Sequence, residues 1–479
     1  MPARHLSGRH VVVVGGGITG LAAAWFLRQA PEPPRVTVLE AGAEVGGKLK
    51  AGSLGGHAVD AGAESMLARR PEARDLAMAA GLGAALVQPA TTAARVMVDG
   101  RLVPFPSGTI LGVPTDLPAL AASGVLTRRG MARVRAERLL PASAEHGDAS
   151  VGRYVTARLG REVTERLVEP LLGGVYAGSA ATLSLEATMP AIAEARVRGE
   201  RLVAAAARVR ASAGASADGS SPFVGLAGGL FTLPQRLATT EGVQVRTRTT
   251  ARELHRHPDG RWQVVVGPVP RPEVVDADAV LVAVPATAAA RLLREPAPAA
   301  AALVELVDYA SVALIALGYR RSDVPAGALQ GSGHLVPPRE GRSVKAATYS
   351  SQKWRWVEET IDDLTVVRMS VGRFGETVDL QRDDADLVRR AAEDAADVLG
   401  LHSRPVAGSV FRWGGSLPQY TPGHTTRAAR VHEMVGAVPG LAVAGAALDG
   451  VGIPACIASA RRGSDAVLRA LQADGTIAP

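Results

Sequence analysis

The sequence is poor in cysteine and aromatic residues and has no long apolar run. Its single cysteine, Cys456, excludes an internal disulfide and is typical of a reducing compartment. No apolar stretch reaches the roughly 18 residues that span a bilayer, and residues 1–10 lack the apolar core of a secretory signal. These absences favour a cytoplasmic protein without a transmembrane segment and leave peripheral contact with a membrane open.

Lysine is also scarce, and the positive charge is spread along the chain. The formal net charge is +7, and arginine supplies most of the basic residues, because the only lysines are Lys48, Lys50, Lys345 and Lys353. No basic block or aromatic stacking platform is present, which argues against binding of nucleic acid. No His, Cys and carboxylate residues have metal-ligand spacing, so no metal site is predicted. An acidic small molecule is at least as good a partner for this charge.

The chain does have enough apolar residues for large buried cores. With 479 residues, 47% of them apolar, it is expected to form two or three domains. The apolar run His10–Val14 predicts a buried parallel strand, residues 18–29 a helix, and Val36–Leu39 a second strand. This strand–helix–strand order is typical of a Rossmann-like nucleotide-binding domain.

A glycine fingerprint joins the first strand to the helix. Residues 15–20 read Gly-Gly-Gly-Ile-Thr-Gly and match G-x-G-x-x-G. In this motif Gly15 permits a tight turn, Gly17 lets the backbone approach a pyrophosphate at the helix N-terminus, and Gly20 allows close helix–strand packing. Glu40 ends the second strand, where a carboxylate accepts hydrogen bonds from a ribose diol and repels a 2′-phosphate. The sequence therefore predicts a dinucleotide site that disfavours NADP.

Two further segments decide between NAD and FAD. Residues 44–48, Glu-Val-Gly-Gly-Lys, resemble the Gly-Gly motif of amine-oxidase-like flavoproteins, which is a second pyrophosphate contact. Near the C-terminus, a strand at 441–444 leads into Gly-Val-Gly-Ile-Pro at 450–454, with the proline in the first turn of a helix. That helix N-terminus would stabilise the negative charge of a reduced flavin. FAD is therefore the predicted cofactor.

The remaining segments predict a second domain interleaved with the first. Several stretches alternate between apolar and polar residues, as in a mostly antiparallel sheet: 311–319, 334–336, 345–350 and 365–372. Others are predicted to be helical: 117–140, 150–172 and about 186–209. A Ser/Gly/Ala-rich linker is predicted at 211–222.

The predicted fold class is α/β with α+β inserts. A Rossmann-like FAD-binding domain would comprise residues 1–67, 224–284 and 421–479. The interleaved substrate-binding domain, an antiparallel sheet plus helices, would comprise residues 68–223 and 285–420, with a helical insert at about 110–210.

Four more segments resemble the bacterial protoporphyrinogen/coproporphyrinogen oxidases of haem biosynthesis. Residues 170–178 read Pro-Leu-Leu-Gly-Gly-Val-Tyr-Ala-Gly and resemble the family's P-L-L-x-G-I-Y-A-G. Residues 228–234 resemble its G-G-L-x-x-L-P, residues 412–424 its R-W…P-Q-Y…H, and residues 452–457 its G-x-P-x-C-I. The similarity extends from about residue 8 to residue 471, almost the whole chain.

The resemblance implies cofactor contacts and substrate contacts. The implied FAD contacts are Gly15, Gly16, Gly17, Ile18, Thr19, Gly20, Glu40, Ala41, Gly47, Lys48, Gly62, Ala63, Glu64, Ser65, Ala251, Trp413, Val451, Gly452 and Ile453. The implied substrate contacts are Ser332, Gly333, His334, Leu335 and Met369. No catalytic side chain is implied, because flavin N5 accepts the hydride. Ser332 stands where a similar segment of the animal enzymes has Phe, which leaves room for propionate groups.

The activity implied by the resemblance is oxidation of a porphyrinogen to a porphyrin, with molecular oxygen as acceptor and hydrogen peroxide as its product. Coproporphyrinogen III carries more propionates than protoporphyrinogen IX and suits a basic chain better; both stay open. A ferrochelatase-type protein is the implied transient partner. The alternatives are a flavin amine oxidase or carotenoid desaturase of the same superfamily, and a non-enzymatic binding protein on this fold, such as the escort proteins of prenylated GTPases.

Overall fold

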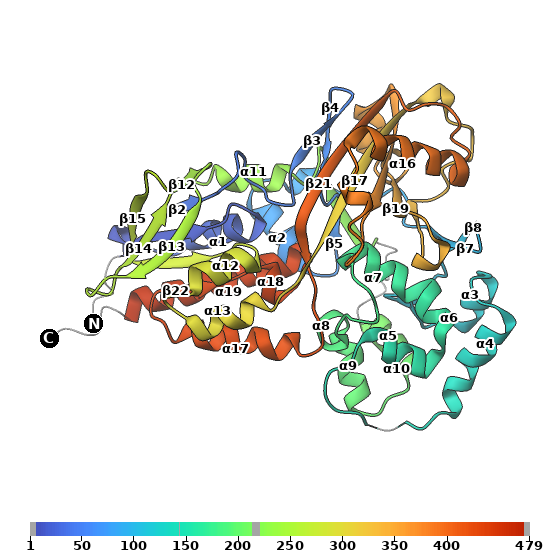
Figure 1. Ribbon diagram of the computed structural model, residues 1–479, viewed down its shortest axis with the longest axis horizontal. Coiled ribbons are helices and arrows are strands. Elements are labelled where there is room, and N and C mark those ends of the chain that lie inside the picture. The colour runs from blue at the N-terminus through green and yellow to red at the C-terminus, as the bar shows by residue number, and fades with distance from the viewer. Residues whose placement is uncertain (1–5, 143, 213–220, 474–479) are drawn as a thin grey trace.

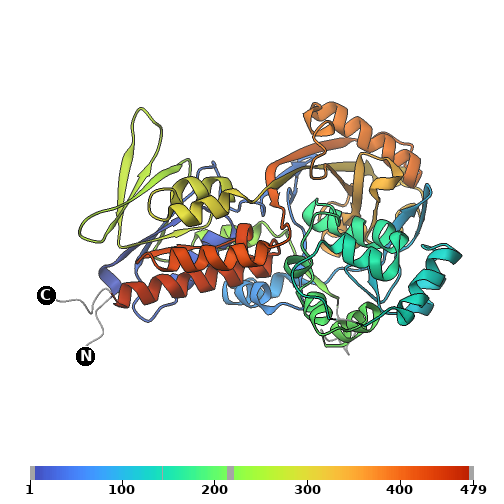
Figure 2. The same cartoon turned by 60° about the horizontal axis from the view of Figure 1, so that its bottom comes forward.

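The chain folds into two lobes, each built around its own sheet (Figures 1 and 2). The computed structural model describes residues 6–142, 144–212 and 221–473. One lobe contains a five-stranded parallel sheet and the other a seven-stranded sheet. The predicted combination of a Rossmann-like α/β domain with an antiparallel insert is confirmed.

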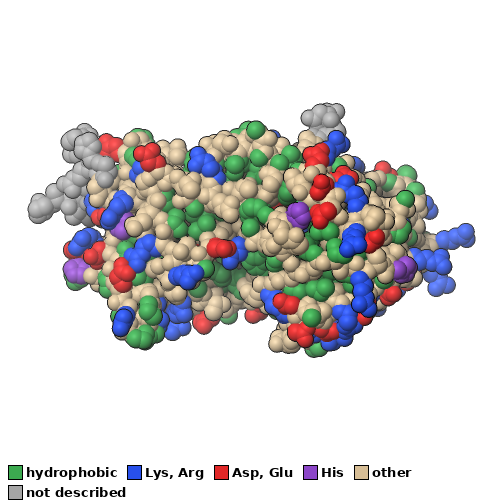
Figure 3. All heavy atoms as spheres, turned by 90° about the horizontal axis from the view of Figure 1, so that it is seen from above, with side chains coloured by type: hydrophobic (Ala, Val, Ile, Leu, Met, Phe, Trp, Pro, Cys, Tyr) green, Lys and Arg blue, Asp and Glu red, His purple; other side chains and the backbone are tan. Residues whose placement is uncertain are grey.

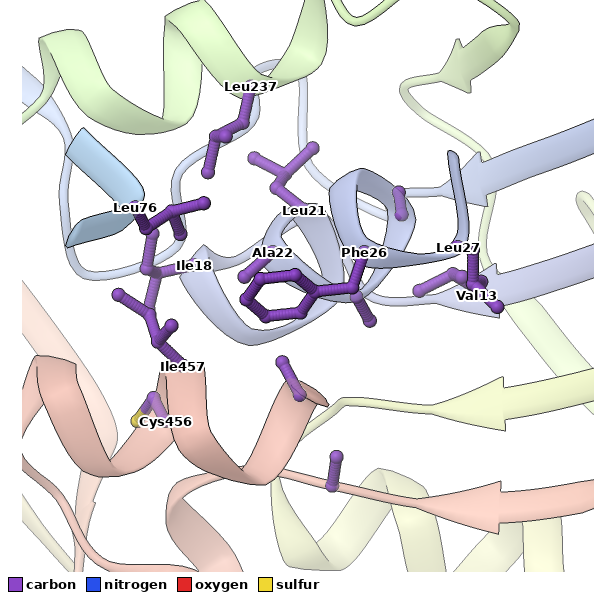
Figure 4. Close-up of a cluster of buried hydrophobic side chains, with 14 of the residues drawn as sticks. Val13, Ile18, Leu21, Ala22, Phe26, Leu27, Leu76, Leu237, Cys456 and Ile457 are labelled. Atoms are coloured by element: carbon purple, nitrogen blue, oxygen red, sulfur yellow. The ribbon is translucent and has the colours of Figure 1, made fainter. Parts of the chain in front are cut away.

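The parallel sheet has the strand order β12 (Val243–Arg246), β2 (Arg35–Leu39), β1 (His10–Val14), β16 (Ala279–Val282) and β22 (Leu441–Val443). All of β1 is buried, because the sheet is covered on both faces. One face carries α1 (Ile18–Arg28), α2 (Pro71–Ala79), α11 (Thr232–Ala238) and α19 (Ile453–Ala473), whose apolar side chains meet in Figure 4. The other face carries α12 (Ala286–Leu293), α13 (Pro298–Glu305), α17 (His424–Gly436) and a small sheet of β13 (Ala251–Arg256), β14 (Trp262–Val266) and β15 (Glu273–Ala277).

The larger sheet has the strand order β21 (Ala407–Pro418), β17 (Tyr309–Arg320), β20 (Leu364–Val371), β19 (Val344–Tyr349), β18 (Gly333–Leu335), β7 (Ala94–Val98) and β8 (Arg101–Pro104). Only β18 and β7 pair in parallel. Helix α16 (Asp384–Leu399) covers one face of this sheet. Helix α7 (Glu169–Tyr176) packs on the opposite face, over β18 and β19.

The helical insert is more broken than the sequence predicts. The expected helix 117–140 divides into α3 (Leu117–Ala122) and α4 (Arg128–Arg135), and 186–209 into α8 (Leu185–Thr188), α9 (Pro190–Val197) and α10 (Leu202–Ser212). The helix expected at 150–172 divides into α5 (Val151–Leu159), α6 (Arg161–Val163), a π-helical turn and α7. One break in each falls at a glycine with positive φ: Gly124 (69°), Gly160 (94°) and Gly199 (72°). Of the predicted linker, residues 213–220 lie outside the described residues.

Packing crosses the predicted domain boundaries. The hairpin β3 (Ala51–Leu54) and β4 (His57–Asp60) falls in the predicted FAD-binding range, but its apolar side chains pack with the seven-stranded sheet. Helices α2, α12 and α13 fall in the predicted substrate-binding ranges, but they pack on the parallel sheet. An apolar pattern shows that a segment has a buried face and leaves open which sheet covers it.

Candidate active site

The glycine fingerprint forms a cradle at the N-terminus of α1. Gly15 has φ of 110°, and a Cβ added at Gly20 would lie 1.8 Å from the Gly15 carbonyl oxygen, so a side chain is excluded there. At Gly17 the backbone is ordinary, with φ of −76°, and an added Cβ would meet only the Cα of Gly47, at 3.9 Å. No described side chain caps α1. Its first N–H groups are therefore free to bind an anion.

Glu40 lies against this cradle from the end of β2. The Gly16 N–H donates to Glu40 Oε2 at 2.8 Å, and the Gly42 N–H donates to Oε1 at 2.6 Å. A carboxylate has about four lone-pair sites, so capacity for ribose hydroxyls remains. The Thr249 N–H donates to the Glu40 carbonyl at 2.8 Å, which brings Ala251, the first residue of β13, to the same end of the site.

The Gly-Gly motif closes the other side of the cradle. The Gly46 N–H donates to the Gly16 carbonyl at 2.8 Å, and a Cβ added at Gly47 would lie 3.1 Å from the Cα of Gly17. A Cβ added at Gly62 would lie 1.9 Å from the Lys48 carbonyl oxygen. Burial lowers the pKa of Lys48, and an anion beside it would raise that pKa again. The backbone at Gly47 and Lys48 therefore contacts Gly17 on one side and Gly62 on the other.

The far end of this path is formed by Trp413. A Cβ added at Gly62 would also lie 3.4 Å from the Trp413 ring, and the Trp413 Nε1–H donates to the Ala61 carbonyl at 2.9 Å. Val451 packs against the helical insert. The glycine cradle, Glu40, the Gly-Gly motif, Gly62 and Trp413 are therefore connected by close contacts into one strip. A ribose would lie at Glu40, a pyrophosphate at Gly17 and a flavin ring near Gly62 and Trp413, so the residues fit FAD.

Glu64 is one predicted cofactor contact whose side chain is already occupied. Its carboxylate accepts hydrogen bonds from Lys353 Nζ at 2.9 Å and Arg368 Nη1 at 2.7 Å. Burial alone would raise the pKa of Glu64, but these two cations outweigh it and hold the pKa well below its usual range. Only the backbone of Glu64 is therefore free to contact a cofactor.

Replacing Glu40 by alanine tests the ribose end of the strip. Glu40→Ala removes a charged acceptor and is expected to weaken FAD binding by about 1.5–3 kcal/mol, measured by flavin fluorescence titration. Unfolding by urea should change little, because Glu40 is half-buried at a strand end. Unchanged FAD affinity would place the ribose elsewhere.

Four half-buried side chains lie next to one another across the inner face of the seven-stranded sheet. They are called the cavity-floor row here, and they are Leu314, Ser370, Ala346 and Leu335. They lie in register on β17, β20, β19 and β18 and are all half-buried, although their strands are interior. Above them, Gly173 of α7 is buried, yet a Cβ added to it would meet nothing within 4 Å. Open space therefore lies beside Gly173, where α7 packs over β18 and β19.

Strand alternation places two predicted substrate contacts on the opposite face. Met369 is fully buried under α16, beside Ile315 and Ala347. His334 is also buried, and its Nδ1 lies 2.8 Å from the Tyr349 hydroxyl. Burial lowers the pKa of His334 to about 4, so the ring is neutral at pH 7. Strand alternation in β18 and β20 therefore turns the His334 and Met369 side chains away from the cavity-floor row, and their contact with substrate stays a prediction.

The other predicted substrate contacts lie at or near the cavity. Leu335 belongs to the cavity-floor row and lies 3.7 Å from the position of a Cβ added at Gly174. Gly333 is on the same face, where a Cβ would lie 2.1 Å from the Ala347 carbonyl oxygen. Ser332 precedes β18 and its hydroxyl donates to the Ala93 carbonyl at 3.1 Å. The Ser332 hydroxyl is therefore already hydrogen-bonded to the loop that precedes β7.

Tyr420 links the helical insert to the loop before α19, a role that sequence reasoning missed. Its hydroxyl donates to the Ala446 carbonyl. Its ring lies 5.8 Å from that of Tyr176 in an edge contact and 4.1 Å from that of His424 in a stacked one. The His424 Nε2 in turn lies 3.1 Å from the Leu448 carbonyl. The Y-A-G and P-Q-Y motifs therefore meet beside the far end of the strip.

Asp449 anchors the same loop and was also missed by the sequence reasoning. It accepts hydrogen bonds from the Ser459 hydroxyl and from His432 Nε2, the latter at 3.0 Å, and it pairs with Arg462 at 3.1 Å. The Ser459 Oγ also accepts from the Gly445 N–H at 2.8 Å. No sequence motif signals this contact, because its members come from α17, α18 (Ala446–Asp449) and α19.

The face of the molecule seen in Figure 3 carries charged side chains of both signs, which are interspersed. Among residues 6–142, 144–212 and 221–473, no helix has the length and apolar character needed to cross a membrane. In the same residues, no group of three or more His, Cys, Asp and Glu side chains could hold a metal ion.

Known proteins resemble this chain along nearly its whole length. Residues 18–468 match the family described as flavin containing amine oxidoreductase. A Mycobacterium tuberculosis protein named coproporphyrinogen III oxidase is 38% identical over 476 residues, 97% of this chain and 98% of that protein. A Bacillus subtilis protein of the same name is 32% identical over 461 residues, 94% of this chain and 96% of that protein.

The two-lobed fold also occurs in a solved structure. The crystal structure of an Exiguobacterium protein, to which protoporphyrinogen oxidase activity is ascribed, matches with a TM-score of 0.83 and 32% sequence identity. The match covers 96% of this chain and 99% of that one. Both lobes are therefore shared, not only the nucleotide-binding one.

Proposed function

We propose, because this chain belongs to the family of flavin containing amine oxidoreductases, that it oxidises coproporphyrinogen III to coproporphyrin III in haem biosynthesis. The observation that carries this proposal is the 38% identity, over 97% of the chain, to a protein named coproporphyrinogen III oxidase. The geometry agrees with it, since Arg368 joins the Gly62 end of the strip to β20, the strand that carries Ser370 of the cavity-floor row, and open space adjoins Gly173 of α7.

In this proposal the protein binds and orients the cofactor and the macrocyclic substrate. The N-terminus of α1 would hold the pyrophosphate, Glu40 a ribose, and the Gly62 backbone with Trp413 the ring system. When bound there, FAD supplies a two-electron acceptor. The cavity-floor row would receive the macrocycle and set a methylene bridge against that acceptor. No side-chain base is assigned, since His334 faces away from the cavity.

The overall reaction removes six electrons and six protons from the macrocycle in three two-electron rounds. Three molecules of oxygen take them up and become three of hydrogen peroxide. Purified protein is therefore expected to carry one noncovalent FAD per chain and to release about three peroxides per coproporphyrin. Porphyrin fluorescence and a peroxidase-coupled assay measure both products. Reactions without protein correct for autoxidation, and release of FMN or the absence of peroxide would contradict the proposal.

Protoporphyrinogen IX is the second candidate substrate, because that activity is ascribed to the similar Exiguobacterium protein. An amine oxidase is less well supported, since residues 446–449, Ala-Ala-Leu-Asp, offer no aromatic cage beside the C-terminal motif. A non-enzymatic binding protein is also less well supported, since the glycine cradle is intact.

A further inference from the structure

Glu64 is held by four donors that all come from the other lobe. Lys353 Nζ and Trp354 Nε1 donate to Oε1 at 2.9 and 3.2 Å, and Ser350 Oγ and Arg368 Nη1 donate to Oε2 at 3.0 and 2.7 Å. The side chains of the charged members are mostly buried, with exposed fractions of 12% for Glu64, 14% for Lys353 and 8% for Arg368. A buried carboxylate this well satisfied fixes its surroundings rigidly.

Arg368 holds the same stretch of chain at a second point. Its Nη2 donates to the Gly62 carbonyl at 2.6 Å, while its Nη1 pairs with Glu64. Gly62 is the residue that abuts both the Lys48 carbonyl and the Trp413 ring. The Arg368 Nε is buried without a partner among the described residues. One guanidinium therefore spans the Gly62–Glu64 segment at the flavin end of the proposed FAD site.

The cluster of Lys353, Arg368 and Glu64 has an excess of positive charge. It contains two cations and one carboxylate, for a net charge of +1 among these three residues, which an ionised Asp60 would balance. Asp60 is the next acid in electrostatic contact, and burial raises its pKa to about 6. Asp60 accepts hydrogen bonds from the Leu230 and Phe231 N–H groups at 3.1 and 3.2 Å, which partly balance its charge. Charges in such a buried setting act more strongly than in water.

We propose that Arg368, Lys353 and Glu64 form a buried charge cluster that positions the Gly62–Glu64 backbone and, through the positive charges of Arg368 and Lys353, favours the reduced, negatively charged form of bound flavin. This inference rests on the proposed FAD site. Arg368 and Lys353 are positioning residues in this scheme, and they act on the cofactor through the segment they hold and through their field.

Charge-changing variants with opposite expected signs test this role. Arg368→Gln and Lys353→Gln each remove a positive charge and are expected to lower the reduction potential of bound FAD. Glu64→Gln removes the negative charge and is expected to raise it. We expect shifts corresponding to about tenfold in the ratio of affinities for reduced and oxidised FAD, or about 30 mV for two electrons. Anaerobic titration against a reference dye measures the potential, and no substrate turnover is needed.

Two further sets of variants distinguish the effect of a lost charge from a general destabilisation of the fold. Arg368→Lys keeps the charge but loses the forked hydrogen bonds, so it should weaken FAD binding while leaving the potential near that of the wild type. The buried pair Arg158–Glu137 in the helical insert is a matched control, since its side chains are 12% and 4% exposed. Arg158→Gln and Glu137→Gln should destabilise the fold and leave the potential unchanged.

Shifts of the same sign in Glu64→Gln and Arg368→Gln, or no shift in either, would overturn the inference. If both variants lose FAD, the potential of FAD bound to Lys353→Gln is the deciding measurement. A raised or unchanged potential in that variant would contradict the inference. A wild-type protein that binds no FAD would instead overturn the proposed function on which the inference rests.

Discussion

Gly17→Ala is expected to weaken FAD binding by at least about 100-fold, equivalent to about 2.8 kcal/mol, while the protein stays folded. Gly17 has φ of −76°, which alanine adopts freely, and the added Cβ would meet only the Gly47 Cα at 3.9 Å. The methyl group would instead occupy the space through which a pyrophosphate approaches the N-terminus of α1. Flavin fluorescence titration measures the affinity, and urea unfolding reports the fold.

Two other glycines provide matched controls for this result. Gly20→Ala puts a Cβ 1.8 Å from the Gly15 carbonyl oxygen, so this variant should lose stability as well as FAD. Gly436→Ala, at the end of α17, meets nothing within 4 Å and should change neither property. Wild-type FAD affinity in Gly17→Ala would show that the pyrophosphate does not lie on this backbone.

Ser370→Trp is expected to lower kcat/KM for coproporphyrinogen III by at least about 100-fold while FAD stays bound. Ser370 lies half-buried in the cavity-floor row, in register with Leu314 and Ala346, so an indole there would fill the space proposed for the macrocycle. A loss of this size corresponds to about 2.7 kcal/mol of transition-state stabilisation. Steady-state rates, normalised to bound FAD, provide the measurement.

The neighbouring Met369 is the control for that substitution. Met369→Ala should cost about 2–5 kcal/mol of unfolding free energy, because Met369 is fully buried under α16. Its kcat/KM per folded molecule should stay close to that of the wild type. If Met369→Ala instead abolishes turnover in a stable protein while Ser370→Trp remains active, the substrate lies on the other face of the sheet.

Local signals in the sequence were sufficient to predict the cofactor-binding lobe. The fingerprint at 15–20 and Glu40 are close in sequence to the strands that carry them, and their spacing follows from backbone geometry. The resemblance added Gly62 and Trp413, and the structure brings both to the same strip. The breaks at Gly124, Gly160 and Gly199 were missed, because the apolar pattern continues across each glycine.

A sequence motif alone does not show to which face of the sheet each side chain of a strand points. A one-residue difference reverses the face, so Leu335 belongs to the cavity-floor row while His334 lies on the opposite face, beside Tyr349. The role of Glu64 depends on Lys353 and Arg368, which lie 289 and 304 residues away in sequence, and no local pattern connects them. Tyr420 illustrates the same limit, since its motif was recognised without the contact it makes to Ala446.

Steady-state oxidation of coproporphyrinogen III and protoporphyrinogen IX, compared side by side, tests the proposed function most directly. Both substrates would be followed by porphyrin fluorescence with the same FAD-loaded protein and corrected for autoxidation. We predict a kcat/KM for coproporphyrinogen III that is higher by about 10-fold or more, the scale on which a pocket distinguishes groups of this size. A preference for protoporphyrinogen IX would contradict the proposed substrate, and oxidation of neither would contradict the proposed activity.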